Sequence, residues 1–222
     1  MSVRTPAGSG RQGARLVLAT HNQGKLRELR ELLRGQVPGL DVDTQVVDAA
    51  AAGAPDVVES GVTFAENSLL KARAVAEATG LVAIADDSGL AVDVLGGAPG
   101  IFSARWAGGH GDDEANLQLL LAQLRDVPDA HRGAAFVCAA ALAVPDAGGL
   151  PGREVVEYGQ LEGFLLREPR GAGGFGYDPV LQPVGDNRSC AELTPAEKNA
   201  ISHRGKAFRA LLPAVVEALN HR

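Results

Sequence analysis

The sequence predicts an α/β protein built on a mixed, twisted sheet with flanking helices. Short apolar runs of strand length alternate along the chain with segments whose apolar residues recur at helical spacing. Residues that start and stop helices separate the two kinds of segment, and strands interleaved with helices are typical of the α/β class. A length of 222 residues predicts one domain, or two closely joined lobes.

The first ordered unit is expected to be strand, loop and helix. Leu16–Ala19 is an apolar run that predicts a buried strand, and Thr20–Gly24 is a polar turn. Leucines recur at helical spacing from Lys25 to Leu33, which predicts a helix. A short strand is expected near Asp43–Val47 after a polar connection.

The second unit has a clear helix start. Thr63 and Glu66 have the spacing of a capping box, so a helix is expected to run from there to about Thr79. Gly80 is expected to end that helix, because glycine accepts the left-handed conformation of a helix C-terminus.

An acidic turn is expected to follow the next strand. Leu81–Ala85 predicts a second buried strand that ends at Asp86–Gly89. Leu90–Leu95 alternates apolar and polar residues as a half-buried strand would, and Gly96–Gly100 predicts a turn.

The C-terminal half predicts five further elements. Acidic residues, a proline and a capping glutamate mark the helix starts. We expect a helix from Asp112 to about Leu124, strands over Ala134–Val144 and Glu154–Phe164, a helix opened by Thr194–Glu197, and a last helix over His203–Leu219 with a bend at Pro213.

Composition excludes several classes of function. The net charge of -6 argues against a general nucleic-acid binder. The two cysteines, Cys138 and Cys190, lack CxxC spacing, which argues against a disulfide framework or a zinc site and is consistent with the reducing cytoplasm. The longest apolar run has eleven residues, too few to span a membrane. Residues 1–15 predict a disordered leader and not a signal peptide.

The loop Thr20–Lys25 is a candidate phosphate cradle. A loop between a strand end and a helix start offers free backbone N–H groups and the positive end of the helix dipole, and Lys25 adds a full charge. It is not a Walker A loop, because the Gly-x-x-x-x-Gly-Lys-Ser/Thr pattern is absent. A plain turn with an exposed lysine explains the spacing equally well.

Acidic residues form the candidate metal site. Asp86 and Asp87 are adjacent, and their mutual repulsion favours a nearby cation or partner. If the strand continues, at most one of them points into a given cleft. Mg²⁺ prefers one or two carboxylates with substrate phosphates and waters. Glu66 is explained by capping, whereas Glu59 is not, so Glu59 is the better second carboxylate; a polar turn remains the alternative.

Two further stretches are compatible with nucleotide binding. Gly171–Pro179 holds Phe175 and Tyr177, whose rings can stack on a purine, although core aromatics in a glycine turn explain them as well. Its Gly-x-Gly-x-x-Gly pattern does not open a helix after a strand, so it does not predict a dinucleotide site. Glu197–Lys206 concentrates cations and a histidine, which predicts either a solvated helix face or an anion site.

Together these stretches resemble the Ham1/RdgB-type inosine triphosphate pyrophosphatase family. The blocks occur in family order from about residue 16 to the C-terminus. The matching text is Leu18–Lys25, Glu59-x-Gly61-x-Thr63-Phe64-x-Glu66-Asn67, Ala85–Leu90 with Gly97–Gly100 and Ser103–Arg105, Gly173–Pro179, and Ser202–Ala207.

The resemblance implies two lobes around a central cleft, a homodimer, and Mg²⁺ as the cofactor. It implies hydrolysis of ITP, dITP and XTP to monophosphate and pyrophosphate, which removes them from the nucleotide pool. Asp87 becomes the general base and, with Glu59, a metal carboxylate. The residues implied to bind substrate are Thr20, His21, Asn22, Gln23, Gly24, Lys25, Ser88, Phe175, Gly176, Tyr177, Asp178, Lys198, His203 and Arg204, with Lys71 as a further phosphate contact.

This hypothesis requires five distant stretches to converge around one polyanion. A hydrogen-bond donor facing the purine 6-oxo group, from His203, Lys198 or a backbone N–H, would discriminate against adenine. Three rivals remain: a Maf-like pyrophosphatase acting on modified pyrimidine nucleotides, a nucleotide-binding regulator without catalysis, and a nicotinamide-binding enzyme.

Overall fold

The structure is a computed structural model that describes residues 13–109, 111–146 and 152–220. Its elements in chain order are β1 (Leu16–Leu18), α1 (Gln23–Leu33), α2 (Val42–Gln45), β2 (Val46–Asp48), α3 (Ala49–Ala52), α4 (Phe64–Thr79), β3 (Val82–Val92), α5 (Asp113–Gln123), β4 (Gly133–Val144), β5 (Arg153–Leu165), β6 (Leu181–Pro183), α6 (Pro195–Ile201) and α7 (His203–Asn220). Short 3-10 helices cover Asp93–Leu95, Gly100–Arg105, Asp129–His131 and Cys190–Glu192.

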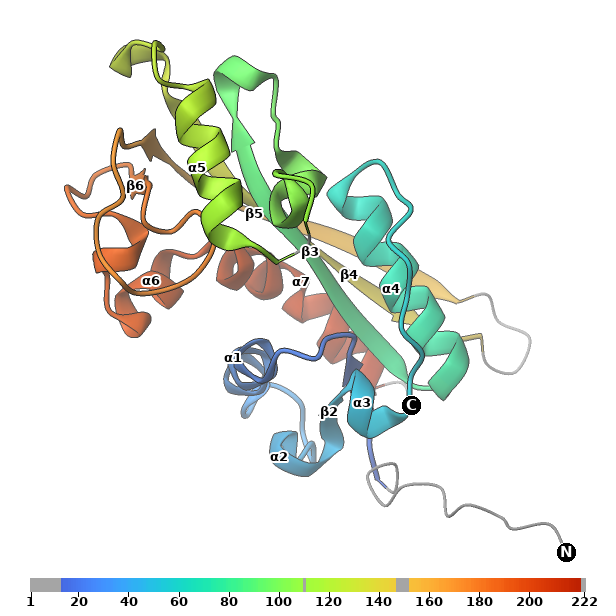
Figure 1. The fold of residues 1–222 in the computed structure, drawn as a ribbon. Coiled ribbons are helices and arrows are strands. Elements are labelled where there is room, and N and C mark those ends of the chain that lie inside the picture. The colour runs from blue at the N-terminus through green and yellow to red at the C-terminus, as the bar shows by residue number, and fades with distance from the viewer. Residues whose placement is uncertain (1–12, 110, 147–151, 221–222) are drawn as a thin grey trace, which may run out of the picture.

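A six-stranded sheet in the order β2-β1-β3-β4-β5-β6 forms the centre of the molecule. β1 runs parallel to β2 and β3, and the remaining neighbours are antiparallel. The prediction of a mixed sheet with flanking helices is therefore confirmed. In Figure 1, β1, β2 and α1 to α3 lie near one end of the long strand β3, and α5, β6 and α6 lie near the other end.

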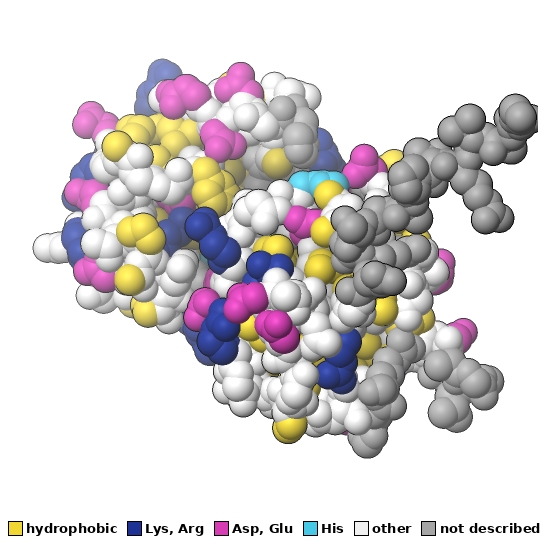
Figure 2. All heavy atoms as spheres, turned by 90° about the horizontal axis from the view of Figure 1, so that it is seen from below, with side chains coloured by type: hydrophobic (Ala, Val, Ile, Leu, Met, Phe, Trp, Pro, Cys, Tyr) yellow, Lys and Arg dark blue, Asp and Glu magenta, His cyan; other side chains and the backbone are white. Residues whose placement is uncertain are grey.

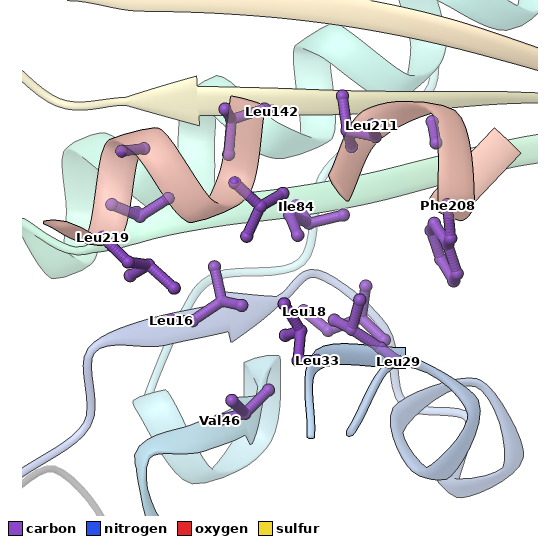
Figure 3. Packing of buried hydrophobic residues seen from close by; sticks show 14 of the residues in the cluster. Leu16, Leu18, Leu29, Leu33, Val46, Ile84, Leu142, Phe208, Leu211 and Leu219 are labelled. Carbon is purple, nitrogen blue, oxygen red and sulfur yellow. The ribbon is translucent and has the colours of Figure 1, made fainter. Parts of the chain in front are cut away.

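Alternation along the strands assigns the helices to the two faces of the sheet. Leu16 and Leu18 of β1 and Ile84 of β3 pack with α1 and α7 on one face, as Figure 3 shows for the labelled leucines, Ile84 and Phe208. Residues of the opposite register, such as Val17 and Ala83, pack with α4 on the other face. Because successive side chains of a strand point to opposite faces of the sheet, the buried strand residues cover both faces and support a helical layer on each.

A second cluster occupies the far end of the first face. Leu90 and Val92 of β3 pack there with Leu117, Leu120 and Leu124 from α5 and its C-terminal end. Along β3, Ile84 belongs to one cluster and Leu90 to the other, and the polar residues between them separate the two. The two clusters agree with the expected two lobes, which stay a prediction.

Helix boundaries agree closely with the sequence. α4 ends at Thr79, and Gly80 has a φ of 70°, the left-handed conformation expected of a glycine stop. Thr194 and Glu197 form the predicted capping box at the start of α6. α7 continues through Pro213 as one helix. Within the described residues, no helix is long and apolar enough to cross a bilayer.

Two predictions of strand positions were wrong, and one strand was missed. The strand expected near Asp43–Val47 begins only at Val46, because the preceding residues form α2 with Asp41 as its N-cap. The strand expected to end at Ala85 continues to Val92, so no acidic turn interrupts it. β6 was not predicted, since its three residues are too few for a periodic signal.

Residues 1–12 of the expected leader lie outside the described residues. The described part of it contacts the fold: Ala14 is buried, and the backbone N–H of Arg15 donates to the carbonyl of Gln45 at 2.9 Å.

Candidate active site

β3 has an open edge where the site forms. β1 ends at Leu18 and pairs with β3 only over Val82–Ile84. Among the described residues no strand runs along the rest of β3 on that side, and Ala91 makes an isolated bridge to Pro99. On its other side β3 pairs with β4, and Asp86 and Asp87 lie opposite Ala140 and Ala139. This pairing with distant small residues keeps the acidic segment in a strand and directs the two carboxylates to opposite faces.

Asp86 is a buried carboxylate with two cationic partners. Lys25 from α1 donates to both of its oxygens, at 2.8 and 2.9 Å, and Nε of Arg204 from α7 lies 3.2 Å from Oδ2. Burial alone would raise the pKa of Asp86, but the charges of Lys25 and Arg204 hold it well below its usual range. Asp86 is therefore a permanently charged residue that gathers two cations.

Asp87 has a different environment, on the face of the sheet that α4 covers. Nδ2 of Asn67 donates to its Oδ2 at 3.1 Å, and the backbone N–H of Ser88 donates to its Oδ1 at 2.9 Å. Burial raises the pKa of Asp87, and the nearby ammonium of Lys71 opposes this shift. A carboxylate with a raised pKa and no direct ion pair suits proton acceptance better than Asp86 does.

Glu59 approaches the same region from the loop before α4. Nζ of Lys71 lies 2.6 Å from Oε1 of Glu59 and donates to the backbone carbonyl of Asp86 at 2.8 Å. The negative charge of Glu59 also contributes to the raised pKa of Asp87, so the two carboxylates lie within electrostatic range of each other.

Glu66 has a structural role at the start of α4. Its carboxylate accepts the N–H of Val62 at 2.6 Å, and its own N–H donates to Oγ1 of Thr63 at 3.1 Å. The helix start is confirmed, although the carboxylate bonds the residue before the N-cap instead of the N-cap itself. A pocket of about 860 Å³ opens beside these carboxylates, and Glu59 lines it whereas Glu66 does not.

The donors at Glu59 and Asp87 fit Mg²⁺. They supply hard carboxylate oxygens, and Mg²⁺ is commonly held by one or two carboxylates together with waters and substrate phosphates. The described residues contain no cluster of three or more His, Cys, Asp or Glu side chains suited to a metal ion. A site of two carboxylates that is completed by substrate is consistent with both observations.

The candidate cradle begins α1, but its first turn is already capped. Oδ1 of Asn22 accepts the N–H of Gly24 at 2.8 Å and that of Lys25 at 3.3 Å. In this arrangement the charge of Lys25, more than free backbone donors, is what the loop presents to an anion.

The other residues of that loop are engaged elsewhere. Oγ1 of Thr20 accepts the N–H of Asn22, and the exposed His21 lies 3.0 Å from Oδ1 of Asp56. Gln23 donates to Asp48. Thr20, His21 and Gln23 are not among the residues that line the pocket, whereas Asn22, Gly24 and Lys25 are.

The two aromatic residues of the glycine-rich loop have different environments. Phe175 is 61% exposed, and Nζ of Lys198 lies 5.1 Å from its ring centroid. Tyr177 is buried, and its hydroxyl donates to the carbonyl of Ser103 at 2.9 Å. Phe175 thus offers the larger free ring surface for stacking, whereas Tyr177 joins the loop to the core.

Asp178 holds this loop in shape. Its carboxylate accepts the N–H of Phe175 at 2.8 Å and pairs with Nζ of Lys198. Gly174 has a φ of 73°, and a Cβ there would lie 2.1 Å from Oδ2 of Asp178. Glycine is therefore required beside the buried carboxylate, both for its backbone conformation and for its lack of a side chain.

His203 is a partly buried histidine in the pocket wall. Its ring stacks on Phe136 with 5.1 Å between centroids. Burial, with the charge of Arg204, lowers the pKa of His203 to about 3. Its Nδ1 is buried and has no hydrogen-bond partner among the described residues, so it remains available to a ligand.

All five stretches meet at one pocket of about 860 Å³. The pocket is lined by the predicted Asn22, Gly24, Lys25, Glu59, Lys71, Asp87, Ser88, Phe175, Gly176, Tyr177, Asp178, Lys198, His203 and Arg204. In the view of Figure 2, Lys and Arg side chains lie close to Asp and Glu side chains where two rounded parts of the surface meet. The required convergence is thus present in the fold.

Comparison with known proteins decides the family. A model of the Ham1 family matches residues 16–214, nearly the whole described chain. The chain belongs to the Ham1 family. A dITP/XTP pyrophosphatase of Streptomyces coelicolor is 66% identical over 205 residues, covering 92% of this chain and 98% of that relative.

Solved Ham1 family structures have the same fold. A HAM1 protein from Coxiella burnetii matches with a TM-score of 0.80 and 42% identity, covering 92% of this chain and 99% of that chain. A nucleoside-triphosphatase/dITP/XTP pyrophosphatase from Mycobacterium abscessus matches with a TM-score of 0.72 and 49% identity, covering 90% and 99%.

Three residues in or beside this Ham1 family pocket received no role from the sequence. Asn67 orients Asp87 and also accepts the N–H of Gly61 at 2.8 Å. Asp113 accepts the N–H of Gly176 at 2.8 Å, which joins α5 to the glycine-rich loop. Glu28 lines the pocket, and burial raises its pKa. In the sequence, Asn67 and Asp113 resemble ordinary residues of a first helical turn, so only their distant partners reveal these contacts.

Proposed function

We propose that this Ham1 family chain hydrolyses the non-standard purine nucleotides ITP, dITP and XTP to monophosphate and pyrophosphate. One observation carries the proposal: a single pocket combines a half-buried carboxylate of raised pKa, Asp87, with the cations of Lys25 and Arg204. These are the groups that cleavage of a phosphoanhydride requires. The names of the relatives support the same nucleotide class.

The charges of the pocket explain why a divalent cation is needed. Six basic and seven acidic side chains line it, so the pocket as a whole does not neutralise a triphosphate. We place Mg²⁺ at Glu59 and Asp87, and when bound it supplies additional positive charge to the phosphate oxygens. Lys71, which now contacts Glu59, is positioned to move toward the phosphates.

The reaction proceeds by attack of water on the α-phosphorus. Asp87 orients the water and accepts its proton, with Asn67 holding the carboxylate in place. The water oxygen bonds to the α-phosphorus, the bond to the bridging oxygen breaks, and its electron pair leaves with pyrophosphate. Lys25 and Arg204 stabilise the charge that develops on the phosphates.

Selectivity for the base follows from other side chains of the same pocket. Phe175 stacks on the purine, a contact worth about 1–3 kcal/mol in other base-binding proteins. Neutral His203, Lys198 and backbone N–H groups supply the donors for the 6-oxo group. Adenine presents an amino group at that position and leaves such a donor unpaired, which favours the 6-oxo purines.

A pyrophosphate-release assay tests this function. We expect turnover of ITP, dITP and XTP with Mg²⁺, little turnover of ATP, dUTP or TTP, and none in EDTA. Binding of ITP without release of pyrophosphate would instead identify a non-catalytic regulator, and preferential turnover of dUTP or TTP a pyrimidine enzyme. Asp87→Asn should lose most turnover, and Glu66→Gln is the matched control because Glu66 lies outside the pocket lining.

Assembly and location stay predictions. We propose a homodimer, which the mass in solution at low micromolar concentration would test. Both Cys138 and Cys190 are free thiols, in keeping with the proposed cytoplasmic location, and fractionation of cells would test it.

A further inference from the structure

A second cavity lies at the C-terminal end of α5, apart from the candidate active site. It has a volume of about 360 Å³ and shares no lining residue with the larger pocket. The lining comes from α5 and from the segments just before β4 and just after β5: Gln118, Leu121, Ala122, Arg125, Arg132, Arg167, Glu168 and Pro169. Three of these eight residues are arginines, in a chain whose net charge is -6.

Arg132 is the buried cation of this cavity. It is only 2% exposed, and its guanidinium donates to the carbonyls of Leu124, Leu165 and Leu166 at 2.7, 2.8 and 2.9 Å. These bonds join the end of α5 to the end of β5 and use three of the five N–H groups that an arginine carries. The described residues provide no carboxylate within ion-pair distance of Arg132. Its direct partners are therefore carbonyl groups, and Asp129 acts on it only at longer range.

The neighbouring arginines increase the positive potential. Arg167 pairs with Asp129 at 2.7 Å and donates to the backbone carbonyl of Arg125 at 3.1 Å. Burial and the charge of Arg167 lower the pKa of Arg132, and Asp129 opposes this effect. The side chain of Arg125 is exposed and has no hydrogen bond or ion pair among the described residues. Glu168 is the one acidic residue of the lining.

We propose that this cavity binds a small oxyanion of the phosphate type. Arginine presents a planar fork of N–H donors that matches tetrahedral oxyanions, and bonds between charged partners are the strongest that such a fork makes. The cavity is wide enough for phosphate or pyrophosphate. An anion held there is a negatively charged partner for Arg125 and Arg132, neither of which forms an ion pair among the described residues.

Calorimetric titration of the full chain with inorganic phosphate, and separately with pyrophosphate, tests the proposal at constant ionic strength. The background is Lys25→Ala, which weakens anion binding at the larger pocket. Comparison of the two titrations shows which anion the cavity prefers. Thermal unfolding with and without each anion provides a second measurement, because a ligand that binds only the folded chain raises Tm.

Arg125→Gln is the decisive variant, because this exposed side chain makes no hydrogen bond or ion pair with another described residue, so its loss should leave the fold intact. We expect it to weaken binding about tenfold or more, as the loss of one charge-assisted hydrogen bond implies. Arg153→Gln, an exposed arginine on β5 that pairs with Glu217, is the matched control and should bind as the background does. Equal affinity of Arg125→Gln and Arg153→Gln, or no binding of either anion to the Lys25→Ala chain, would overturn the proposal.

Discussion

The adjacent carboxylates of β3 should respond in opposite ways to the same isosteric change. Asp86→Asn removes the charge that faces Lys25 and Arg204, whose side chains are only 20% and 15% exposed. Asp86 itself is 1% exposed, so water cannot replace the lost charge. The two cations are then left close together without their anion.

The magnitude follows from the burial of this group. Loss of one partner of a buried ion pair costs about 3–5 kcal/mol. Asparagine keeps one acceptor oxygen, so we expect the lower end, about 3 kcal/mol, which lowers Tm by roughly 6–12 °C in a chain of this size. Protonation of Asp86 at low pH should destabilise the fold in the same direction as the substitution. The folded pKa of Asp86 is depressed, so its contribution is present above the unfolded pKa and is lost as the pH falls below it.

Asp87→Asn is the matched comparison. Burial raises the pKa of Asp87, so its ionised form opposes folding at neutral pH, and a neutral amide should leave Tm equal or higher. Turnover should nevertheless fall by about 10²–10⁴-fold, the usual contribution of a general base.

Thermal unfolding and pyrophosphate release measured on the same two variants test the reasoning. A Tm of Asp86→Asn within about 2 °C of the wild type would refute the account of the buried ion pair, given the expected shift. A Tm loss in Asp87→Asn as large as that in Asp86→Asn would refute the contrast between the two faces of the strand.

Three further predictions address other groups of the pocket. Lys25→Ala should raise KM for ITP about tenfold to a hundredfold, because one charged hydrogen-bond donor to phosphate is lost, and an unchanged KM would count against the cradle. The pKa of His203 is about 3 in the folded chain and 6.5 for an ordinary histidine, so the unfolded chain binds more protons between these values and stability rises with pH there. His203→Gln should therefore show a shallower rise of the urea midpoint between pH 4.5 and 7, and an identical slope would contradict burial of the neutral ring. Asp113→Ala frees the N–H of Gly176 and should raise KM for ITP several-fold, whereas Glu114→Ala, which removes an exposed contact to the next helical turn, should not; equal effects would show that Asp113 does not position the loop.

Local sequence signals predicted α1, α4, α5, α6 and α7 well, because their determinants lie within a few residues, but they missed the four-residue helices α2 and α3. Asp112 caps α5 through the N–H of Ala115, and Thr194 caps α6 with Glu197 reaching back to it. Such contacts span three residues and are visible in the sequence. The strands were predicted less well, because their limits depend on neighbours far along the chain.

β3 illustrates this limit. Its polar centre predicts a turn after Ala85, yet β4 supplies Ala139 and Ala140 alongside it and keeps Asp86 and Asp87 in the ladder. Pairing between strands is a long-range contact, so a local pattern that favours a turn is overridden by tertiary structure.

The sequence by itself determined the α/β class, the starts and stops of every helix but the four-residue α2 and α3, and the five stretches from which the pocket is built. Only the tertiary structure decided which side chains face the pocket and with what charge. It directs Asp86 toward α1 and α7 and Asp87 toward α4, and it buries Tyr177 while leaving Phe175 exposed. The physical reason is that the direction of a side chain follows from the residue's place in the strand, whereas its pKa and partners follow from which distant helices cover each face.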